Sequence, residues 1–316
     1  MEIRNLGNSG LRVSAVGLGC NNLGGRIDLD ASRRVVDEAL DSGITLFDVA
    51  DVYGRDHHHG ASEEALGEIL GARRHDIVLA TKFGLPMNKQ GTLKGASRGY
   101  IMRAVDASLR RLRTDYIDLY QLHTPDPLTP IEETLRALDD LIRAGKIRYI
   151  GSSNLPAWQV AQAHHVAREI GANHFVSCQD ELSLVATGAE RELIPAIEQY
   201  GLGLLPYFPL ASGLLTGKYR RAETPAAGTR FAEWKHLGNT YLTERNWAIV
   251  EQLEAVAAAH GHGLITLAFG WLLAKSCVSS VIAGATRPEQ VRGNVAAGSV
   301  ALSASTLAAI DAVLAG

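Results

Sequence analysis

Three ionisable side chains stand at the ends of short apolar runs in this sequence, where core packing alone does not favour a charge. Asp48 follows "TLF", Lys82 ends "DIVLATK" and His123 ends "YIDLYQLH". A lysine or an aspartate buried alone costs roughly several kcal/mol, so such groups are expected in pairs. We therefore expect Asp48 and Lys82 to form an ion pair, which can serve catalysis or be purely structural.

Tyr53 lies five residues after Asp48, in the stretch "ADVYG". A free tyrosine has a pKa of about 10 and exchanges protons poorly near neutrality. A neighbouring ammonium favours the phenolate, so we expect Lys82 to lower the pKa of Tyr53 and make it a usable general acid for a carbonyl oxygen. Asp48 would hold Lys82 in place and charged. His123 would hydrogen-bond the same oxygen, unless it is an ordinary core histidine.

These residues include no nucleophile or hydride source, so the predicted chemistry requires a cofactor. Ser153, Asn154 and Gln179 also end apolar runs, and their polar groups are complementary to an amide. They are therefore candidates for binding a nicotinamide carboxamide. Tyr207, at the end of "LGLLPY", is a candidate for stacking on the nicotinamide ring.

The elements that must position these residues follow from the alternation of short apolar runs with longer amphipathic segments. Short, nearly continuous apolar runs are typical of strands buried on both faces. Eight strand–helix units in about 300 residues predict a (β/α)₈ TIM barrel, whose functional groups lie at the C-terminal ends of its strands. A doubly wound sheet is the alternative, but "GLGCNNLGG" does not fit the G-x-G-x-x-G turn that such a sheet normally carries. The expected strands are 15–19, 45–49, 76–82, 116–123, 147–153, 174–179, 202–207 and 279–284.

Two of the segments between strands carry clear helix-end signals. "DASRRVVDEALDSG" predicts a helix with Asp30 as N-cap and Gly43 as its stop. "TPIEETLRALDDLIRAGK" predicts a helix with Thr129 as N-cap, Pro130 in the first turn and Gly145 at the end.

Two embellishments of the barrel are also expected. The opening "IRNLGNSGLRVS" predicts an N-terminal hairpin that turns at residues 8–10 and covers the bottom of the barrel. The segment 208–241 after the seventh strand is long and irregular, as functional loops often are. No composition shift marks a linker, so residues 1–316 are expected to form a single domain.

Composition excludes several classes of function. A net charge of −3 argues against a nucleic-acid partner, because phosphate-binding proteins usually carry a basic surplus. No apolar run approaches the about 20 residues that a membrane helix needs, and the N-terminus lacks the features of a signal peptide. Three widely separated cysteines favour buried reduced thiols. We therefore expect a cytoplasmic protein with no membrane partner, and its oligomeric state stays open.

Six motifs in order resemble the aldo-keto reductase family over essentially the whole chain. They are "FDVADVYG", "LATKFG", "YIDLYQLH", "IRYIGSSN", "YFPLASGLLTGKY" and "VIAGATRPEQVRGN". The stretches "HTPDP" and "GLLTGKY" resemble the bacterial branch that contains aryl-alcohol-dehydrogenase-like proteins and is related to potassium-channel β subunits.

The resemblance implies a catalytic tetrad of Asp48, Tyr53, Lys82 and His123, with Tyr53 as proton donor in the reversible reduction of an aldehyde or ketone to an alcohol. It implies NADPH bound in extended form, with NADH possible. Arg287 is the candidate for the 2′-phosphate, because a guanidinium recognises phosphate well. By position, Ser153, Asn154, Gln179 and Tyr207 would contact the nicotinamide; Leu210, Ser212, Gly213 and Lys218 the pyrophosphate; Gly284, Thr286, Arg287, Gln290 and Asn294 the adenosine end; and Arg230 would fold over the cofactor.

Four positions depart from the family pattern. Val49, Leu182, Phe208 and Gly293 replace a threonine, a tyrosine, a serine and an acid that are common in the family. None of the four belongs to the tetrad, and the differences bear on individual cofactor contacts.

Other interpretations stay open. A nicotinamide-binding sensor or channel-associated subunit with weak turnover would share the tetrad. The triplet His57–His59 suggests a metal, but zinc ligands come from separated positions and adjacent side chains on an extended loop diverge. We expect the triplet to line the pocket beside Tyr53. The basic cluster Arg110, Arg111 and Arg113 is expected to be a solvated helix end.

Overall fold

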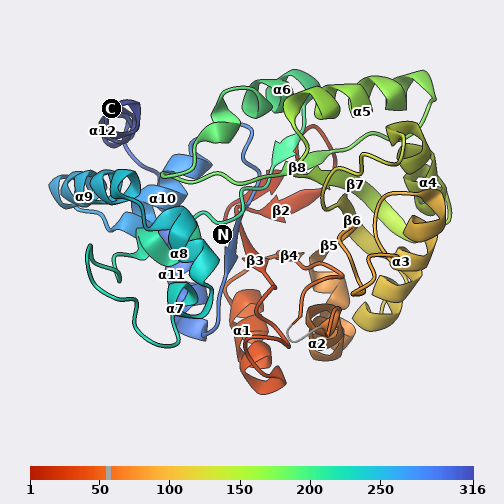
Figure 1. Ribbon diagram of the computed structural model, residues 1–316, viewed down its shortest axis with the longest axis horizontal. Coiled ribbons are helices and arrows are strands. Elements are labelled where there is room, and N and C mark those ends of the chain that lie inside the picture. The colour runs from red at the N-terminus through yellow and green to blue at the C-terminus, as the bar shows by residue number, and fades with distance from the viewer. Residues whose placement is uncertain (55–57) are drawn as a thin grey trace.

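Eight parallel strands lie at the centre of the computed structural model, which describes residues 1–54 and 58–316. The strands are β3 (Val16–Gly19), β4 (Leu46–Asp48), β5 (Val78–Phe83), β6 (Ile117–Leu122), β7 (Ile147–Ser153), β8 (Ser177–Gln179), β9 (Gly203–Leu204) and β10 (Val281–Gly284). Each strand from β3 to β8 pairs with the next one along the chain, and β10 pairs with β3 (Figure 1). All eight expected strands are present, with shorter bounds at several ends.

Backbone hydrogen bonds join β9 to the segment that enters β10. The Leu204 N–H donates to the Cys277 oxygen (2.7 Å), and the Ser279 N–H donates to the Leu204 oxygen (3.0 Å). The Ile282 N–H donates to the Pro206 oxygen at 3.0 Å. These bonds link the two ends of the sheet, and the predicted (β/α)₈ barrel is confirmed.

Helices surround the sheet as a ring in which sequential helices pack side by side (Figure 1). The ring comprises α1 (Leu29–Asp41), α2 (Ala61–Leu70), α3 (Arg98–Leu112), α4 (Ile131–Arg143), α5 (Ala157–Glu169), α6 (Leu193–Tyr200), α10 (Leu264–Leu273) and α11 (Pro288–Gly298). Outside it lie α9 (Glu244–Ala259) and α12 (Ala304–Ala315). The segment 208–241, expected to be irregular, contains the 3-10 helix η3 (Ala211–Thr216), α7 (Arg230–Glu233) and α8 (Lys235–Tyr241).

Two of the predicted helix caps are wrong. The N-cap of α1 is Asp28, whose carboxylate accepts the Ala31 N–H at 2.8 Å, whereas Asp30 lies within the first turn. The N-cap of α4 is Pro130, and the Thr129 hydroxyl donates to Asp126 at 2.7 Å instead of capping the helix. Both predicted stops hold: Gly43 and Gly145 follow the helix ends with positive φ, which glycine adopts without a steric penalty.

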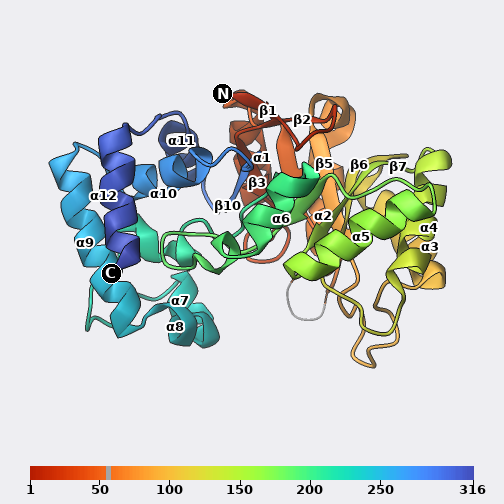
Figure 2. The ribbon, with the colours of Figure 1, turned by 90° about the horizontal axis from the view of Figure 1, so that it is seen from above.

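The predicted N-terminal hairpin is present as β1 (Ile3–Asn5) and β2 (Arg12–Ser14), which pair antiparallel. Leu6 and Val13 form a small cluster within the barrel together with Leu46, Ala80, Leu119 and Ile282 of the strands and Leu205, which follows β9. Gly7 passes so close to β9 that an added Cβ would lie 2.5 Å from the Gly203 nitrogen. Figure 2 shows the hairpin at one end of the barrel, away from α7 and α8.

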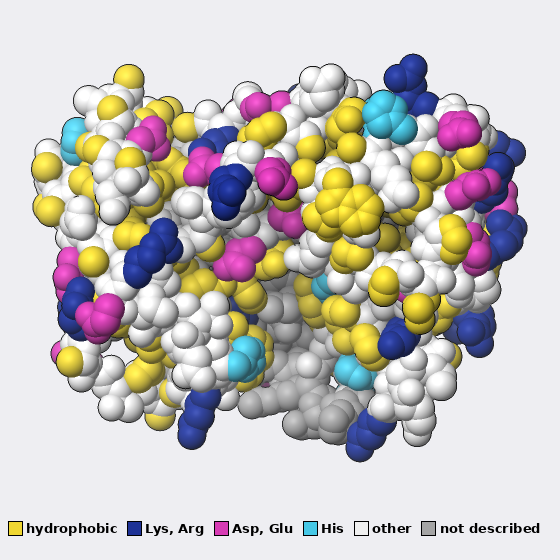
Figure 3. All heavy atoms as spheres, turned by 45° about the horizontal axis from the view of Figure 1, so that its top comes forward, with side chains coloured by type: hydrophobic (Ala, Val, Ile, Leu, Met, Phe, Trp, Pro, Cys, Tyr) yellow, Lys and Arg dark blue, Asp and Glu magenta, His cyan; other side chains and the backbone are white. Residues whose placement is uncertain are grey.

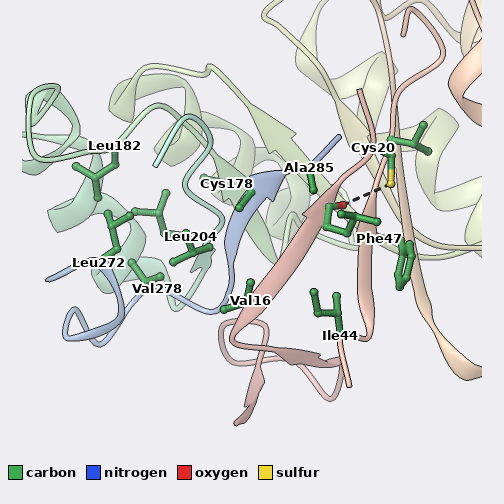
Figure 4. Packing of buried hydrophobic residues seen from close by; sticks show 14 of the residues in the cluster. Val16, Cys20, Ile44, Phe47, Cys178, Leu182, Leu204, Leu272, Val278 and Ala285 are labelled. Carbon is green, nitrogen blue, oxygen red and sulfur yellow. Dashed lines mark hydrogen bonds between the residues drawn. The ribbon is translucent and has the colours of Figure 1, made fainter. Parts of the chain in front are cut away.

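The larger apolar core lies between the sheet and the helices. Figure 4 shows part of it, with Val16 and Phe47 from the strands and Leu272 from α10. The three cysteines are buried and free, as expected for reduced thiols. Cys20 and Cys178 belong to this core and are fully buried.

The surface shown in Figure 3 has acidic and basic side chains interspersed over it. Within the described part of the chain, no single helix is long and apolar enough to cross a membrane. The pair α9 and α10 meets the length and composition criteria jointly, but it bends by 92°. Trp247, Leu253, Phe269 and Trp271 of this pair are buried in the core.

Candidate active site

A cavity of about 560 Å³ opens at the C-terminal ends of the strands. Its walls come from the loop after β3, the ends of β4, β7 and β8, the segment after β9, and the start of α11. This is the end of the barrel where the sequence placed the polar residues. Of the expected catalytic residues, Asp48, Tyr53 and His123 line the cavity.

Lys82 lies behind the cavity wall and connects two of these residues. Its ammonium donates to Asp48 Oδ2 at 2.6 Å, to the Val49 oxygen at 3.1 Å and to the Tyr53 hydroxyl at 3.3 Å. Lys82 is fully buried and Asp48 nearly so. The predicted Asp48–Lys82 pair is therefore present, and it is aimed at Tyr53.

Asp48 is held from its other side by two amides that the sequence analysis did not assign to it. Oδ1 accepts hydrogen bonds from Gln121 Nε2 at 3.2 Å and Gln179 Nε2 at 2.9 Å. Gln121 was missed altogether, although alternation along β6 was a usable signal. Successive side chains of a strand face opposite sides, so Gln121 shares the inward face with Leu119. Gln179 lines the cavity while its amide nitrogen supports Asp48.

The expectation that Lys82 lowers the pKa of Tyr53 is wrong in its net direction. Burial raises the pKa of Tyr53 and outweighs the attraction of the Lys82 ammonium for a phenolate. Burial also opposes the charge of Lys82, but Asp48 and Tyr53 raise the pKa of Lys82 overall. Tyr53 is therefore a protonated phenol beside a charged ammonium, which is the state of a proton donor.

His123 faces Tyr53 with an edge-to-face ring arrangement, the ring centroids lying 5.9 Å apart. Burial, with the nearby Lys82 charge, lowers the pKa of His123 to about 3. The imidazole is therefore neutral near pH 7. Within the residues the structure describes, its buried Nδ1 has no hydrogen-bond partner.

Asn154 connects the residues expected at the nicotinamide. Its Nδ2 donates to the His123 oxygen and to Ser153 Oγ, both at 3.0 Å, and its Oδ1 accepts from the Tyr207 hydroxyl at 2.9 Å. Its φ of +60° is unusual for a residue with a side chain. Ser153 in turn donates to the Gln179 oxygen at 2.7 Å. One hydrogen-bonded wall of the cavity is therefore formed by Ser153, Asn154, Gln179 and Tyr207.

The residues expected at the pyrophosphate also line the cavity, namely Leu210, Ser212, Gly213 and Lys218, and Arg230 lies with them. Ser212 is buried with φ of +56°, and its hydroxyl has no partner among the described residues. The buried Nε of Arg230 is likewise unpartnered there. Unsatisfied buried polar groups are costly, and these two belong to residues that line the cavity.

At the opposite end, Gly284, Thr286, Gln290 and Asn294 line the cavity. Gln290 Oε1 accepts from both the backbone N–H (2.7 Å) and the hydroxyl (3.1 Å) of Thr286, which fixes the turn into α11. Arg287 is different: it is exposed at the N-cap of α11 and does not line the cavity. Of the four departures from the family pattern, Phe208 and Gly293 line the cavity, and Val49 and Leu182 are buried.

Several residues of the loop after β3 line the cavity and were missed, among them Arg26 and Asn22. Arg26 pairs with Glu233 at 3.1 Å and donates to the Gly228 oxygen at 2.8 Å. Asn22 accepts a hydrogen bond from Arg230 at 3.5 Å. These contacts join residues more than 200 positions apart across the cavity, so sequence spacing gave no signal for them.

Two members of the histidine triplet have ordinary local partners. His58 pairs with Glu64 at 3.0 Å, and His59 Nδ1 lies 3.1 Å from the Val52 oxygen. His57 lies outside the described residues. Neither His58 nor His59 lines the cavity, so the structure does not place them where the sequence analysis did. Within residues 1–54 and 58–316 there is no cluster of three metal-ligating side chains.

Comparison with known proteins identifies the family. The model of the aldo/keto reductase family matches residues 15–315. The chain is 38% identical over 305 residues to a probable voltage-gated potassium channel subunit beta of Oryza sativa subsp. japonica, covering 94% of this chain and 91% of that protein. It is 35% identical over 323 residues to the uncharacterized oxidoreductase YrpG of Bacillus subtilis (strain 168), covering 100% and 97%.

A third relative is a versiconal hemiacetal acetate reductase of Aspergillus parasiticus, 34% identical over 299 residues, covering 86% of this chain and 85% of that protein. The family match and these relatives extend over nearly the whole barrel. The chain is therefore a member of the aldo/keto reductase family.

Proposed function

We propose that this protein is an NADPH-dependent oxidoreductase that reduces an aldehyde or ketone to an alcohol, reversibly, as a single domain over residues 1–316. The observation that carries the proposal is the position of Lys82, whose ammonium lies 2.6 Å from Asp48 and 3.3 Å from the Tyr53 hydroxyl at the cavity floor. Family membership supports an oxidoreductase of this general type.

The cavity is suited to a nicotinamide dinucleotide. Its volume lies within the range of about 300–1,000 Å³ that is usual for ligand sites. Ser212 Oγ and Arg230 Nε are buried donors without a partner in the described part of the chain, and phosphate oxygens would satisfy them. When bound, the reduced nicotinamide supplies the hydride. The Ser153–Asn154–Gln179 wall would hold its carboxamide, and Tyr207 would pack on its ring.

The side chains of the chain itself then manage the proton. Tyr53 donates its phenolic proton to the carbonyl oxygen of the substrate. Lys82, hydrogen-bonded to the Tyr53 oxygen, stabilises the phenolate that remains. Asp48, fixed by Gln121 and Gln179, keeps the ammonium in place. The neutral imidazole of His123 donates a hydrogen bond that orients the same carbonyl oxygen.

A second function has specific support from the comparisons. Several relatives are named as voltage-gated potassium channel β subunits. We therefore retain the alternative of a nicotinamide-binding sensor, or a channel-associated subunit, with weak turnover. The tetrad geometry is compatible with both functions, and only the rate of turnover separates them.

The test is consumption of NADPH across a panel of aldehydes, ketones and sugars, with NADH compared in parallel. A reductase gives repeated turnover with at least one class of carbonyl and prefers NADPH. A sensor gives one slow oxidation of bound NADPH in single-turnover mixing and little steady-state rate. If NADPH binds but no carbonyl oxidises it even once, the proposed reaction is wrong.

A further inference from the structure

The turn that carries Tyr53 contains a second acid, Asp51, which the proposed mechanism does not use. Asp51 is 1% exposed. Neither of its carboxyl oxygens has a hydrogen-bond partner within 3.5 Å among the described residues. Looser contacts join the carboxyl group to the Val52 N–H and the Tyr100 hydroxyl. An unpaired buried carboxylate is costly, whereas a neutral carboxylic acid is much less so. This acid therefore needs an explanation.

The surroundings of Asp51 disfavour a second negative charge. Glu63 of α2 is fully buried, and its carboxylate already receives the Thr81 hydroxyl at 2.6 Å and Arg111 Nε at 2.7 Å. Burial raises the pKa of Asp51 well above its usual range, and the Glu63 charge raises it further. Arg111 and Lys82 act in the opposite direction but do not prevail.

Arg111 thus has a role that the sequence analysis did not assign to it. It was expected in a solvated helix end with Arg110 and Arg113. Its guanidinium instead pairs with buried Glu63 and packs over Gly60, where an added Cβ would lie 2.5 Å from Arg111 Cδ. Arg111, the α3 cation that acts on Asp51, is therefore already paired with another carboxylate.

Two tyrosine hydroxyls complete the pocket. Tyr100 of α3 and Tyr120 of β6 are buried, and within the described chain neither hydroxyl has a partner within 3.5 Å, although a looser contact with Asp51 contributes to the raised pKa of Tyr100. Asp51 raises the pKa of both phenols, after burial itself, which indicates that the three groups lie close together. A neutral acid can donate to one hydroxyl and accept from the other.

The backbone connects this pocket to the proposed catalytic residues. The Asp51 N–H donates to the Lys82 oxygen at 3.1 Å, and the Tyr53 N–H donates to the Ala50 oxygen at 3.1 Å. The backbone carbonyl oxygen of Tyr53 accepts the Ser62 N–H from α2 at 3.2 Å. A displacement of Asp51 would therefore move the turn that sets the Tyr53–Lys82 distance.

We propose that Asp51 is held as a protonated acid and acts as a positioning residue, fixing the turn 50–53 so that the Tyr53 hydroxyl faces Lys82. The proposal rests on the proposed role of Tyr53. Ionisation of Asp51 beside Glu63 repels the turn from α2 and draws water into the pocket. The expected consequence is loss of reduction when Asp51 ionises or when its side chain is removed.

Protonation is tested by urea unfolding of wild type and Asp51→Asn between pH 5 and pH 8. Folded wild type retains a proton that the unfolded chain releases above about pH 4, so its unfolding constant rises relative to D51N by about tenfold per pH unit. Asp139 is the matched control, a buried carboxylate bonded to Asn173 whose pKa is lowered by those bonds despite burial. The unfolding constant of wild type relative to that of Asp139→Asn is expected to stay constant over this pH range. If the unfolding constant of wild type relative to that of D51N is also independent of pH, the proposal is wrong.

Positioning is tested by comparing D51N with Asp51→Leu in NADPH-dependent reduction. D51L loses about tenfold to hundredfold in kcat with the KM for NADPH unchanged, because small displacements of catalytic groups are costly. D51N, which keeps the shape and hydrogen-bonding of the neutral acid, restores most of that kcat. If D51L does not fold, the alkaline limb of the D51N kcat profile decides instead. If kcat of D51N falls at a higher pH than kcat of wild type, the result supports a positioning role for Asp51. If kcat falls at the same or a lower pH, the result contradicts that role.

The two proposals fail in distinguishable ways. If Tyr53→Phe reduces aldehydes at the wild-type rate, the proposed function is wrong while the tenfold-per-unit slope of D51N still stands. If that slope is absent while Tyr53→Phe is inactive, only the inference about Asp51 is wrong.

Discussion

The Lys82 ammonium and the Asp48 carboxylate meet at 2.6 Å where neither side chain is more than slightly exposed. Removing one partner of such a pair leaves an uncompensated buried charge, which is far costlier than the net contribution of the intact pair. The same ammonium reaches the Tyr53 hydroxyl. Lys82 is therefore expected to affect stability through Asp48 and catalysis through Tyr53. Substitutions can measure the two effects separately.

Asp48→Asn should lower the free energy of unfolding by about 3–5 kcal/mol and also reduce kcat, because Lys82 stays charged without its partner. Urea denaturation of Asp48→Asn, Lys82→Met and the double variant measures the coupling. The double variant should be less destabilised than the sum of the single losses. Strict additivity would show that the two groups do not interact.

Tyr53→Phe should lower kcat for aldehyde reduction by about 10²–10⁴-fold, the usual contribution of a general acid. NADPH affinity should change little, since the phenol is expected to contact the substrate. Stopped-flow oxidation of bound NADPH and a fluorescence titration measure the two quantities. Tyr149→Phe, at the hairpin end of the barrel, is the matched control and should keep wild-type kcat.

His123 should make the protein less stable in acid. Its pKa is about 3 in the fold against an ordinary value near 6.5, so its contribution to stability is fully present above pH 6.5 and is lost as pH falls towards 3. His123→Asn removes this loss. Between pH 7.5 and pH 5, wild type should lose up to about 2 kcal/mol relative to the variant in urea unfolding. Parallel pH dependence of the two proteins would mean that His123 is not held neutral.

Arg287→Ala should weaken NADPH binding by roughly tenfold or more and leave NADH binding nearly unchanged, if the exposed guanidinium receives the 2′-phosphate. Arg292→Ala is the control, because Arg292 lies on the same helix but pairs with Glu38 and Glu289. Isothermal titration with both cofactors distinguishes them. An equal loss for NADPH and NADH would assign Arg287 a role unrelated to that phosphate.

The barrel and the pairing of Asp48 with Lys82 could be predicted because they depend on local patterns. Strand spacing and the position of a polar residue at a strand end are properties of a few consecutive residues. The helix caps failed by one or two residues, since Asp28, Asp30 and Thr129 have similar propensities and only the backbone geometry selects among them.

Features that depend on distant residues could not be predicted in this way. The contact of Arg26 with Glu233 requires the folded barrel. The direction of the Tyr53 pKa shift depends on burial, which opposes the Lys82 charge and exceeds it. The sequence indicates which charged groups can pair. It does not indicate whether burial or the attraction of a neighbouring charge has the larger effect on a pKa.

The N-terminal hairpin has a consequence for the order in which the chain assembles. It is synthesised before the rest of the barrel, yet the Gly7 N–H donates to the Ser279 hydroxyl 272 positions later, and the Asn8 N–H donates to the Gly201 oxygen. Contacts of such long sequence separation form slowly, because chain closure must precede them. The contacts of the hairpin with Ser279 and Ile282 are therefore expected to form only after the segment that contains β10 has been synthesised. The hairpin residues, although made before the strands they contact, are therefore among the last to reach their final contacts.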